Sequence, residues 1–192
     1  MDYNIKDLLE DDFFDKLELE VMQNFSRLKM VIMDNLETHF SVDRPDPRKK
    51  PYSLGDKEFM FPITMELWTV YKWVIGKSKK PMETYEILQS VCEMVWSNPF
   101  IPKYNYTINW EEWKQTRLGS LVDIAFKRLH LESGRDLSAN DLSVLAGISA
   151  QAISQKIPDE IQAEKKDNKW QISADEALKF LKNRDLKIYK GR

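Results

Sequence analysis

Apolar residues recur at helical spacing along most of the chain. Between residues 14 and 36 they fall at steps of three and four, which predicts one buried stripe on a long amphipathic helix. The stripe consists of Phe14, Leu17, Val21, Phe25, Leu28, Ile32 and Leu36. The basic, proline-containing run 43–51 cannot continue this helix, because proline lacks an amide hydrogen and restricts the residue before it. We therefore expect a loop over 41–62.

Two shorter helices are predicted in the middle of the chain. Thr64 is placed to cap a helix that stops at Gly76, and Pro81 is placed to open a helix that Ser-Asn-Pro at 97–99 stops. A fourth helix is expected from 110 to 131, because the residues before it have capping-box spacing and glycine follows it. The cap is Asn109 with Glu112, and the inward face would carry Trp113, Leu118, Leu121, Val122, Ala125 and Leu129.

Two short helices joined by a sharp turn are predicted after residue 137. Ser138 can cap the first, which would present Leu142 and Leu145 inward. Gly147 can end it, because glycine adopts the left-handed conformation at no steric cost. Ser149 can then cap the second helix, with Ala152, Ile153 and Ile157 facing inward and Ala150, Gln151, Ser154 and Gln155 facing outward.

The turn carries a resemblance to known DNA-binding proteins. The run Ala146-Gly-Ile-Ser149, continued by Ala152, Ile153 and Ser154, resembles the helix-turn-helix of the lambda-repressor and Cro-like families. The resemblance implies that the second helix enters the major groove, where a glutamine amide can pair with adenine. Gln151 and Gln155 are the candidate base readers, and Ser149 is a candidate phosphate contact. The alternative for both glutamines is an ordinary solvated position.

A second resemblance covers the end of the chain. Two apolar-alternating arms between residues 161 and 172 flank a Lys-Lys-Asp-Asn-Lys turn, which predicts a β-hairpin with Trp170 on its core side. Ser173 and Glu176 then have the spacing to cap a helix whose inward residues would be Ala177, Leu178 and Leu181. The order of elements resembles winged helix-turn-helix and excisionase-type DNA-binding modules.

Lysines would supply the affinity of such a module. The resemblance makes the hairpin a wing, whose cations lie along the sugar-phosphate backbone together with those of a basic tail. Together with Lys156 beside the second helix, these residues are Lys165, Lys166, Lys169, Lys187, Lys190 and Arg192. The alternative is that lysines at a hairpin tip only keep the turn solvated.

The charge distribution departs from this pattern. The chain carries 29 basic and 31 acidic side chains, and residues 165–192 hold nine basic against four acidic ones. Between residues 136 and 164, however, Lys156 is the only basic residue beside five carboxylates. Affinity for DNA would therefore depend on the wing, the tail or the basic loops at 48–50 and 77–80, and a protein-binding role stays open.

Catalytic and metal-site patterns are missing from the sequence. It has no phosphate-binding glycine loop, no Gly-x-Ser-x-Gly and no His-Glu-x-x-His, and Cys92, His39 and His130 lack zinc-ligand spacing. We expect no enzyme activity, no cofactor and no metal. Without a membrane-length apolar run or a basic, apolar leader, a cytoplasmic protein with no membrane partner is expected.

These patterns together predict a mainly α protein with two parts. Residues 1–108 would form a helical body for dimerisation or partner binding, and residues 109–192 a DNA-binding domain with a hairpin wing. The predicted function is sequence-specific binding of double-stranded DNA by a homodimeric transcriptional regulator of bacterial or phage type. The alternatives are an excisionase-like architectural protein and a protein-interaction adaptor of antitoxin or phage-assembly type.

Overall fold

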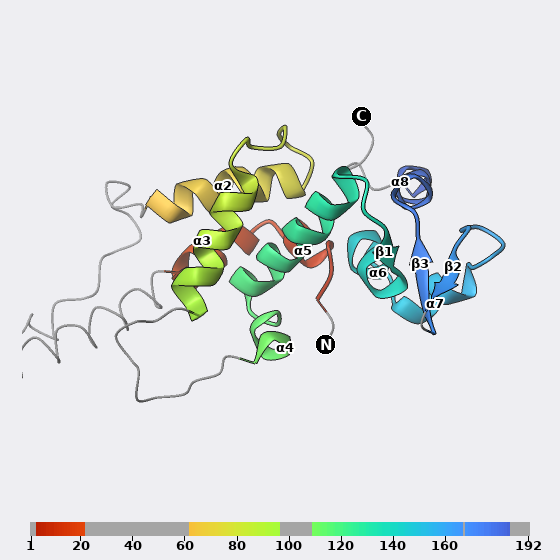
Figure 1. The fold of residues 1–192 in the computed structure, drawn as a ribbon. Helices are drawn as coiled ribbons and strands as arrows, with labels where there is room; N and C mark the ends of the chain where they lie inside the picture. Colours follow the sequence, from red (N-terminus) through yellow and green to blue (C-terminus); the bar gives the residue numbers. More distant parts are fainter. Residues whose placement is uncertain (1–2, 22–61, 97–108, 167, 185–192) are drawn as a thin grey trace, which may run out of the picture.

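The computed structural model describes residues 3–21, 62–96, 109–166 and 168–184. Within these ranges the protein is mainly helical and carries one small antiparallel sheet, which confirms the predicted class (Figure 1). The loop expected over 41–62 and the stripe beyond Val21 fall outside the described residues. No described helix combines the length and the apolar character that crossing a bilayer requires.

The N-terminal part packs three helical segments together. Residues 13–21 are helical after the short helix η1 (Asp7–Leu9), and they are followed by α2 (Pro62–Val74) and α3 (Thr84–Trp96). The described part of the predicted stripe, Phe14, Leu17 and Val21, is buried as expected. The rings of Phe14 and Trp68 meet with centroids 4.4 Å apart, which joins the first segment to α2.

Both predicted helix starts in this part are wrong. Thr64 lies inside α2, because the helix already includes Pro62, and proline is tolerated in a first helical turn. Helix α3 begins at Thr84, since a turn intervenes after Pro81 and the Thr84 hydroxyl donates a hydrogen bond of 2.6 Å to the Pro81 carbonyl. The predicted turn at Gly76 is present, and the stop at 97–99 lies outside the described residues.

The single helix expected from 110 to 131 is two helices. Asn109 caps the short α4 (Trp110–Trp113), and Thr116 caps the long α5 (Arg117–Glu132) by accepting a bond of 3.0 Å from the Gly119 amide. A Cβ at Gly119 would lie 2.0 Å from the Trp113 carbonyl oxygen. Glycine therefore lets the end of α4 fold back against the first turn of α5.

Helix α5 is the central element of the fold. It contacts α2 and α3 on one side and α6 and α8 on the other, and its inward residues are almost fully buried. The first backbone amides of α5 find an acceptor that is remote in the sequence. The Glu20 carboxylate accepts hydrogen bonds from the amides of Arg117 (3.0 Å) and Leu118 (3.2 Å). The helix ends at Glu132, close to the predicted end, and Gly134 follows with a positive φ.

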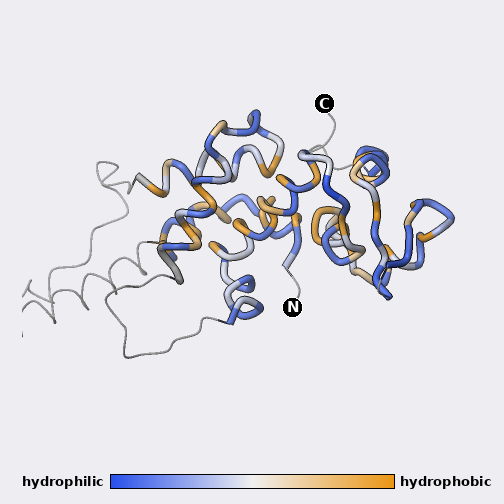
Figure 2. Tube along the Cα trace, in the orientation of Figure 1, coloured by the Kyte–Doolittle hydropathy of each residue, from blue (hydrophilic) through white to orange (hydrophobic). Residues whose placement is uncertain are grey.

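The C-terminal part contains the sheet and three helices. In chain order it runs β1 (Leu137–Ser138), α6 (Ala139–Ala146), α7 (Ala150–Gln155), β2 (Glu164–Lys166), β3 (Lys169–Ile172) and α8 (Ala174–Asn183). The strands lie in the order β1-β3-β2 and are antiparallel. Figure 2 shows apolar positions concentrated where the helices meet and mostly hydrophilic ones along the hairpin.

One hydrophobic core joins the two parts. Ile5 and Leu8 are fully buried in the same cluster as Leu121, Leu145 and Leu181. The Ile5 amide also donates a hydrogen bond of 3.0 Å to the Val144 carbonyl in α6. The first described residues thus pack against the C-terminal elements, and the division at residue 108 stays a prediction.

Candidate nucleic-acid interface

The turn between α6 and α7 forms as the residues predict. Ser138 and Asp141 make a reciprocal capping box at the start of α6, and Gly147 ends that helix in the left-handed conformation with φ of 63°. Ser149 then accepts a hydrogen bond of 3.1 Å from the Ala152 amide and starts α7. Within α7 the side chain of Ile153 is fully buried against the core, so the opposite side of this helix faces solvent.

The outward side of α7 carries polar groups. Ser149, Gln151, Ser154 and Gln155 are exposed, and Ala150 and Lys156 are half-buried. Gln151 and Gln155 are one helical turn apart and therefore share a face. Within the part of the chain that the structure describes, neither carboxamide has a hydrogen-bond partner. Both amides are free to meet an external donor and acceptor.

The two hydroxyls on this side are already engaged. Ser154 donates a hydrogen bond of 3.0 Å to the Ala150 carbonyl, which turns it back onto its own helix. The Ser149 oxygen is used as the cap acceptor, but a hydroxyl can still donate its hydrogen. Ser149 therefore fits an anionic acceptor better than Ser154 does.

The hairpin next to α7 exposes three lysines. Lys166 and Lys169 are directly opposite each other across the ladder, an arrangement that destabilises a sheet when the charges are alike. The ammonium of Lys165 lies 5.8 Å from the ring centroid of Trp170, which is half-buried against the core as expected. None of the three lysines forms an ion pair with a described residue. An anion would relieve the repulsion at this tip.

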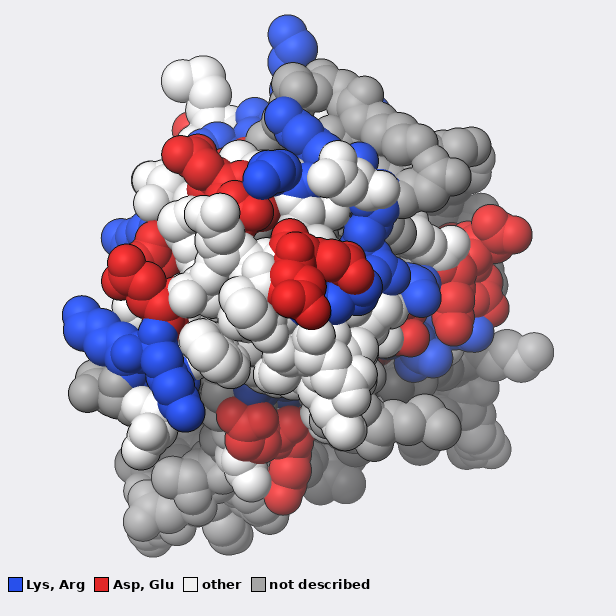
Figure 3. Space-filling view, turned by 90° about the vertical axis from the view of Figure 1, so that its right-hand side faces the viewer, with Lys and Arg blue, Asp and Glu red and all other residues white. Residues whose placement is uncertain are grey.

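The surroundings of α7 are mixed in charge. Figure 3 shows basic and acidic side chains interleaved on this end of the molecule. Lys156 is held by Glu160 at 2.6 Å, so it does not add a free cation. Among the nearby carboxylates, Asp141 is half-buried and lies 3.4 Å from Lys127, which offsets part of the local negative charge.

Several other predicted cations lie elsewhere or outside the described residues. Lys187, Lys190, Arg192 and the basic run 48–50 are not described. The exposed loop 77–80 joins α2 to α3, away from α7 (Figure 1). Helix α7 and the hairpin lie at the same end of the molecule, and this loop lies apart from them (Figure 1).

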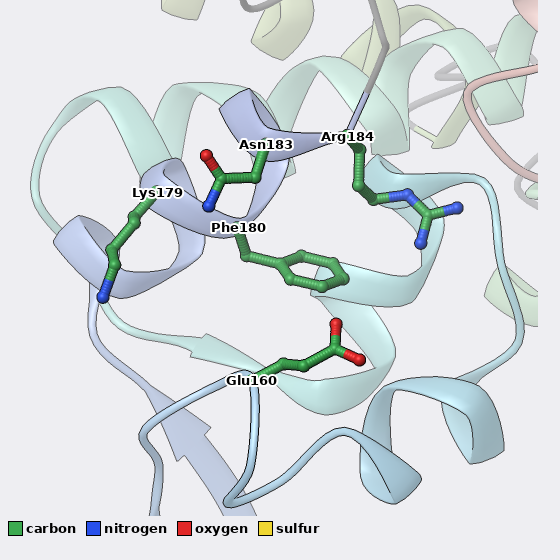
Figure 4. Close-up of a pocket in the computed structure, with 5 residues that line it drawn as sticks. All are labelled: Glu160, Lys179, Phe180, Asn183 and Arg184. Carbon is green, nitrogen blue, oxygen red and sulfur yellow. The ribbon is translucent and has the colours of Figure 1, made fainter.

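A cleft lies beneath α8, behind the loop that follows α7. Its lining side chains are Glu160, Lys179, Phe180, Asn183 and Arg184 (Figure 4). Glu160 and Lys179 are already paired with Lys156 and Glu176, and the Arg184 guanidinium rests 5.6 Å from the Phe180 ring centroid. The charges at this cleft are largely occupied by neighbours within the chain.

The described ranges offer no metal-ion site, and their titratable side chains give no sign of activation. They contain no group of three or more side chains that could bind a metal ion. Burial lowers the pKa of His130, and the guanidinium of Arg135 beside the ring lowers it further, which disfavours the charged imidazolium. Burial raises the pKa of the Cys92 thiol, which disfavours the reactive thiolate.

A polar chain that the sequence did not predict positions α6. The Tyr3 hydroxyl donates to the Asp123 carboxylate, which also binds Lys127. Lys127 in turn reaches Asp141 in the capping box of α6. The spacing of Asp123 and Lys127 is a visible local signal, whereas their long-range partner Tyr3 has none.

Comparison with known families, curated proteins and solved structures gives no match for this chain. The function must therefore be inferred from the geometry and charge of α7 and the hairpin. These two elements combine exposed hydrogen-bonding groups with lysines that form no ion pair with a described residue.

Proposed function

We propose that this protein binds double-stranded DNA with sequence preference through a winged helix-turn-helix made by α5, β1, α6, α7 and the hairpin. The observation that carries the proposal is the exposed face of α7, where Gln151 and Gln155 present two carboxamides that form no hydrogen bond with a described residue. The order helix, strand, helix, helix, hairpin supports it, because a helix at this position lies in the major groove in helix-turn-helix proteins.

Base recognition falls to the two glutamines. A glutamine carboxamide can donate to N7 and accept from the N6 amino group of adenine, a pairing worth about 1–3 kcal/mol of discrimination. Gln151 is nearer the N-terminal end of α7, which enters the groove first. The Ser149 hydroxyl donates to a phosphate oxygen at the edge of the groove. A–T base pairs are therefore expected at the centre of each half-site.

The hairpin supplies the electrostatic part of the affinity. Lys165, Lys166 and Lys169 bind phosphates flanking the site and release counterions, without reading sequence. Phosphate also separates the opposed charges of Lys166 and Lys169. We assign Lys187, Lys190 and Arg192 the same role on the basis of their charge.

A homodimeric transcriptional regulator of bacterial or phage type fits this mode of binding best. One helix in the groove reads only a few base pairs, so a second copy would supply the other half-site. An excisionase-like architectural role keeps the same contacts but predicts DNA bending and tandem half-sites. Sequences selected from a random duplex pool distinguish the two, since the regulator yields inverted repeats.

The decisive experiment measures binding of the selected duplex by the full chain over a series of salt concentrations. Gln151→Ala is expected to relax the sequence preference and leave the salt dependence unchanged. Replacing Lys165 and Lys166 by Gln is expected to weaken all duplexes alike and to reduce the salt slope by about 0.9 for each phosphate that is no longer neutralised. The matched control is the same replacement at Lys79 and Lys80, exposed lysines in the loop between α2 and α3.

The mixed charge around α7 favours a protein-interaction adaptor as the second candidate. Asp159 is exposed close to the end of α7, and its carboxylate would repel a phosphate backbone but suit a basic protein surface. If no duplex binds above background at low salt, the DNA proposal fails. The exposed face of α7 would then be the docking surface.

A further inference from the structure

The N-terminal segment lies against the turn between α6 and α7. Figure 1 shows it running beside α5 and α6, although more than a hundred residues separate them in sequence. Ile5 anchors it twice, through a fully buried side chain and through its amide bond to the Val144 carbonyl near the end of α6. Leu8 is also fully buried.

Lys6 crosses the glycine of the turn. A Cβ built on Gly147 would lie 2.9 Å from both Cγ and Cε of Lys6, so the aliphatic stem of Lys6 covers this glycine. The ammonium is one bond beyond Cε and therefore lies beside the turn that leads into Ser149. Lys6 is exposed and forms no ion pair with any described residue.

Local hydrogen bonds hold the backbone of Lys6 in this position. Its amide donates to the Asn4 side-chain oxygen at 2.9 Å, and the Asn4 amide donates to the Asp7 carboxylate at 2.6 Å. The carboxylate of Asp7, the residue next to Lys6, is thus directed towards the Asn4 amide. These bonds and the buried Ile5 fix Lys6 at the turn rather than leaving it on a free end.

We infer that Lys6 is a phosphate-binding residue of the DNA interface, placed at the start of α7 by the N-terminal segment. The inference rests on the proposed function. Its basis is electrostatic, because residues 136–164 contain one cation, Lys156, and that cation is already paired with Glu160. Phosphates flank the groove where the N-terminal end of α7 enters, and a lysine ammonium binds a phosphate as a point charge. Lys6 supplies the positive charge that the turn itself lacks.

The test compares two lysines of the same segment in the full chain. Lys6→Gln removes one charge and keeps most of the stem over Gly147, and Lys16→Gln makes the same change at an exposed lysine paired with Asp12 at 2.7 Å. With a duplex selected by the wild-type protein, Lys6→Gln is expected to reduce the salt slope by about 0.9 and to weaken selected and scrambled duplexes by equal factors. Lys16→Gln is expected to keep the wild-type slope.

Two further variants separate charge from packing. Lys6→Met retains an apolar stem and should behave like Lys6→Gln, whereas Lys6→Arg should keep the wild-type slope. Thermal unfolding of each variant should match the wild type. A wild-type slope in Lys6→Gln, or an equal reduction in Lys16→Gln, overturns the inference while DNA binding itself stands. If the wild-type chain binds no duplex at all, the proposed function fails and this inference fails with it.

Discussion

The hydroxyl of Tyr3 donates a hydrogen bond to the carboxylate of Asp123, a residue 120 positions further along the chain. Asp123 is only 5% exposed, and among the described residues Tyr3 and Lys127 donate to its carboxylate. Because Lys127 also reaches Asp141, the contact links the N-terminal segment to the start of α6. The placement of α7 therefore depends in part on the first residues of the chain.

Tyr3→Phe is expected to destabilise the protein. The variant keeps the ring but removes one donor from a buried carboxylate, which costs about 1–3 kcal/mol. Urea denaturation followed by circular dichroism measures the decrease. Tyr85→Phe is the matched control, because Tyr85 is 55% exposed and should change stability little. Equal stability of the two variants would contradict a structural role for the Tyr3 hydroxyl.

Stability is expected to fall in alkaline solution. Burial raises the pKa of Tyr3 and of Tyr71 above the ordinary value of 10.0, and Asp123 adds to the rise at Tyr3. The folded chain then keeps both phenolic protons while the unfolded chain releases them, so unfolding becomes more favourable as the pH rises above about 10. Denaturation midpoints measured at increasing pH check this. Tyr3→Phe should reduce the loss of stability with rising pH. A pH profile identical to that of the wild type would contradict the contribution of Tyr3.

Gly147→Ala should destabilise the turn by about 1–2 kcal/mol, because its φ of 63° is unfavourable for a residue with a Cβ. Gly147→Asn should be less destabilising, since asparagine tolerates the left-handed region. The flexible Lys6 stem can move aside in both variants. Thermal unfolding of the two variants compares their stabilities. Equal destabilisation would show that the contact with Lys6, rather than the backbone conformation, determines the loss of stability.

Gly119→Ala is expected to cost more than removal of the neighbouring cap. An added methyl group would meet the Trp113 carbonyl at 2.0 Å, and backbone cannot yield as a side chain can. Overpacking typically costs about 1–3 kcal/mol, and this contact belongs at the upper end of that range. Thr116→Ala, which removes the cap of α5, should cost about 1 kcal/mol. Denaturant titration of both variants tests the order.

Lys166→Glu should separate stability from DNA binding. It replaces a like-charge pair with an opposite-charge pair across from Lys169, which is worth about 0.2–1 kcal/mol in a sheet. The melting temperature should rise slightly at low salt while affinity for DNA falls. Lys182→Glu makes the same charge change on α8 and should not stabilise the protein. If Lys166→Glu is less stable than the wild type and binds DNA as tightly as the wild type does, the proposed role of the Lys166 and Lys169 pair is refuted.

The elements that local spacing predicts are those whose contacts are local. Ser138, Ser149 and Ser173 each cap a helix through an amide three residues ahead, so a short stretch of sequence already contains both partners. The buried and exposed sides of α7 follow from the same short-range periodicity. The presence of a hairpin was also predictable from its turn residues, but its register was not. Lys165, Lys166 and Lys169 were expected in the turn and lie in the strands instead, and β2 is exposed throughout rather than alternating.

The missed break between α4 and α5 has a local part and a long-range part. The Thr116 cap and the close approach of Gly119 to Trp113 involve residues near one another in sequence, but the apolar spacing continues through the break and hides them. The Glu20 carboxylate at the first amides of α5 is 97 residues away and has no local signature. The sequence does not point to Lys6 for the same reason, since it stands in an acidic stretch and reaches the turn only through folding.

The packing of Ile5 and Leu8 has a practical consequence for dissecting this protein. A fragment starting at residue 109 would retain every strand that the structure describes, yet the surface that these two side chains cover would be open to water, so the fragment should be prone to aggregate. Supplying residues 1–108 as a separate chain, which contains this segment together with α2 and α3, should rescue such a fragment. The protein is thus a natural candidate for split-chain complementation, with reassembly reported by recovery of the C-terminal half.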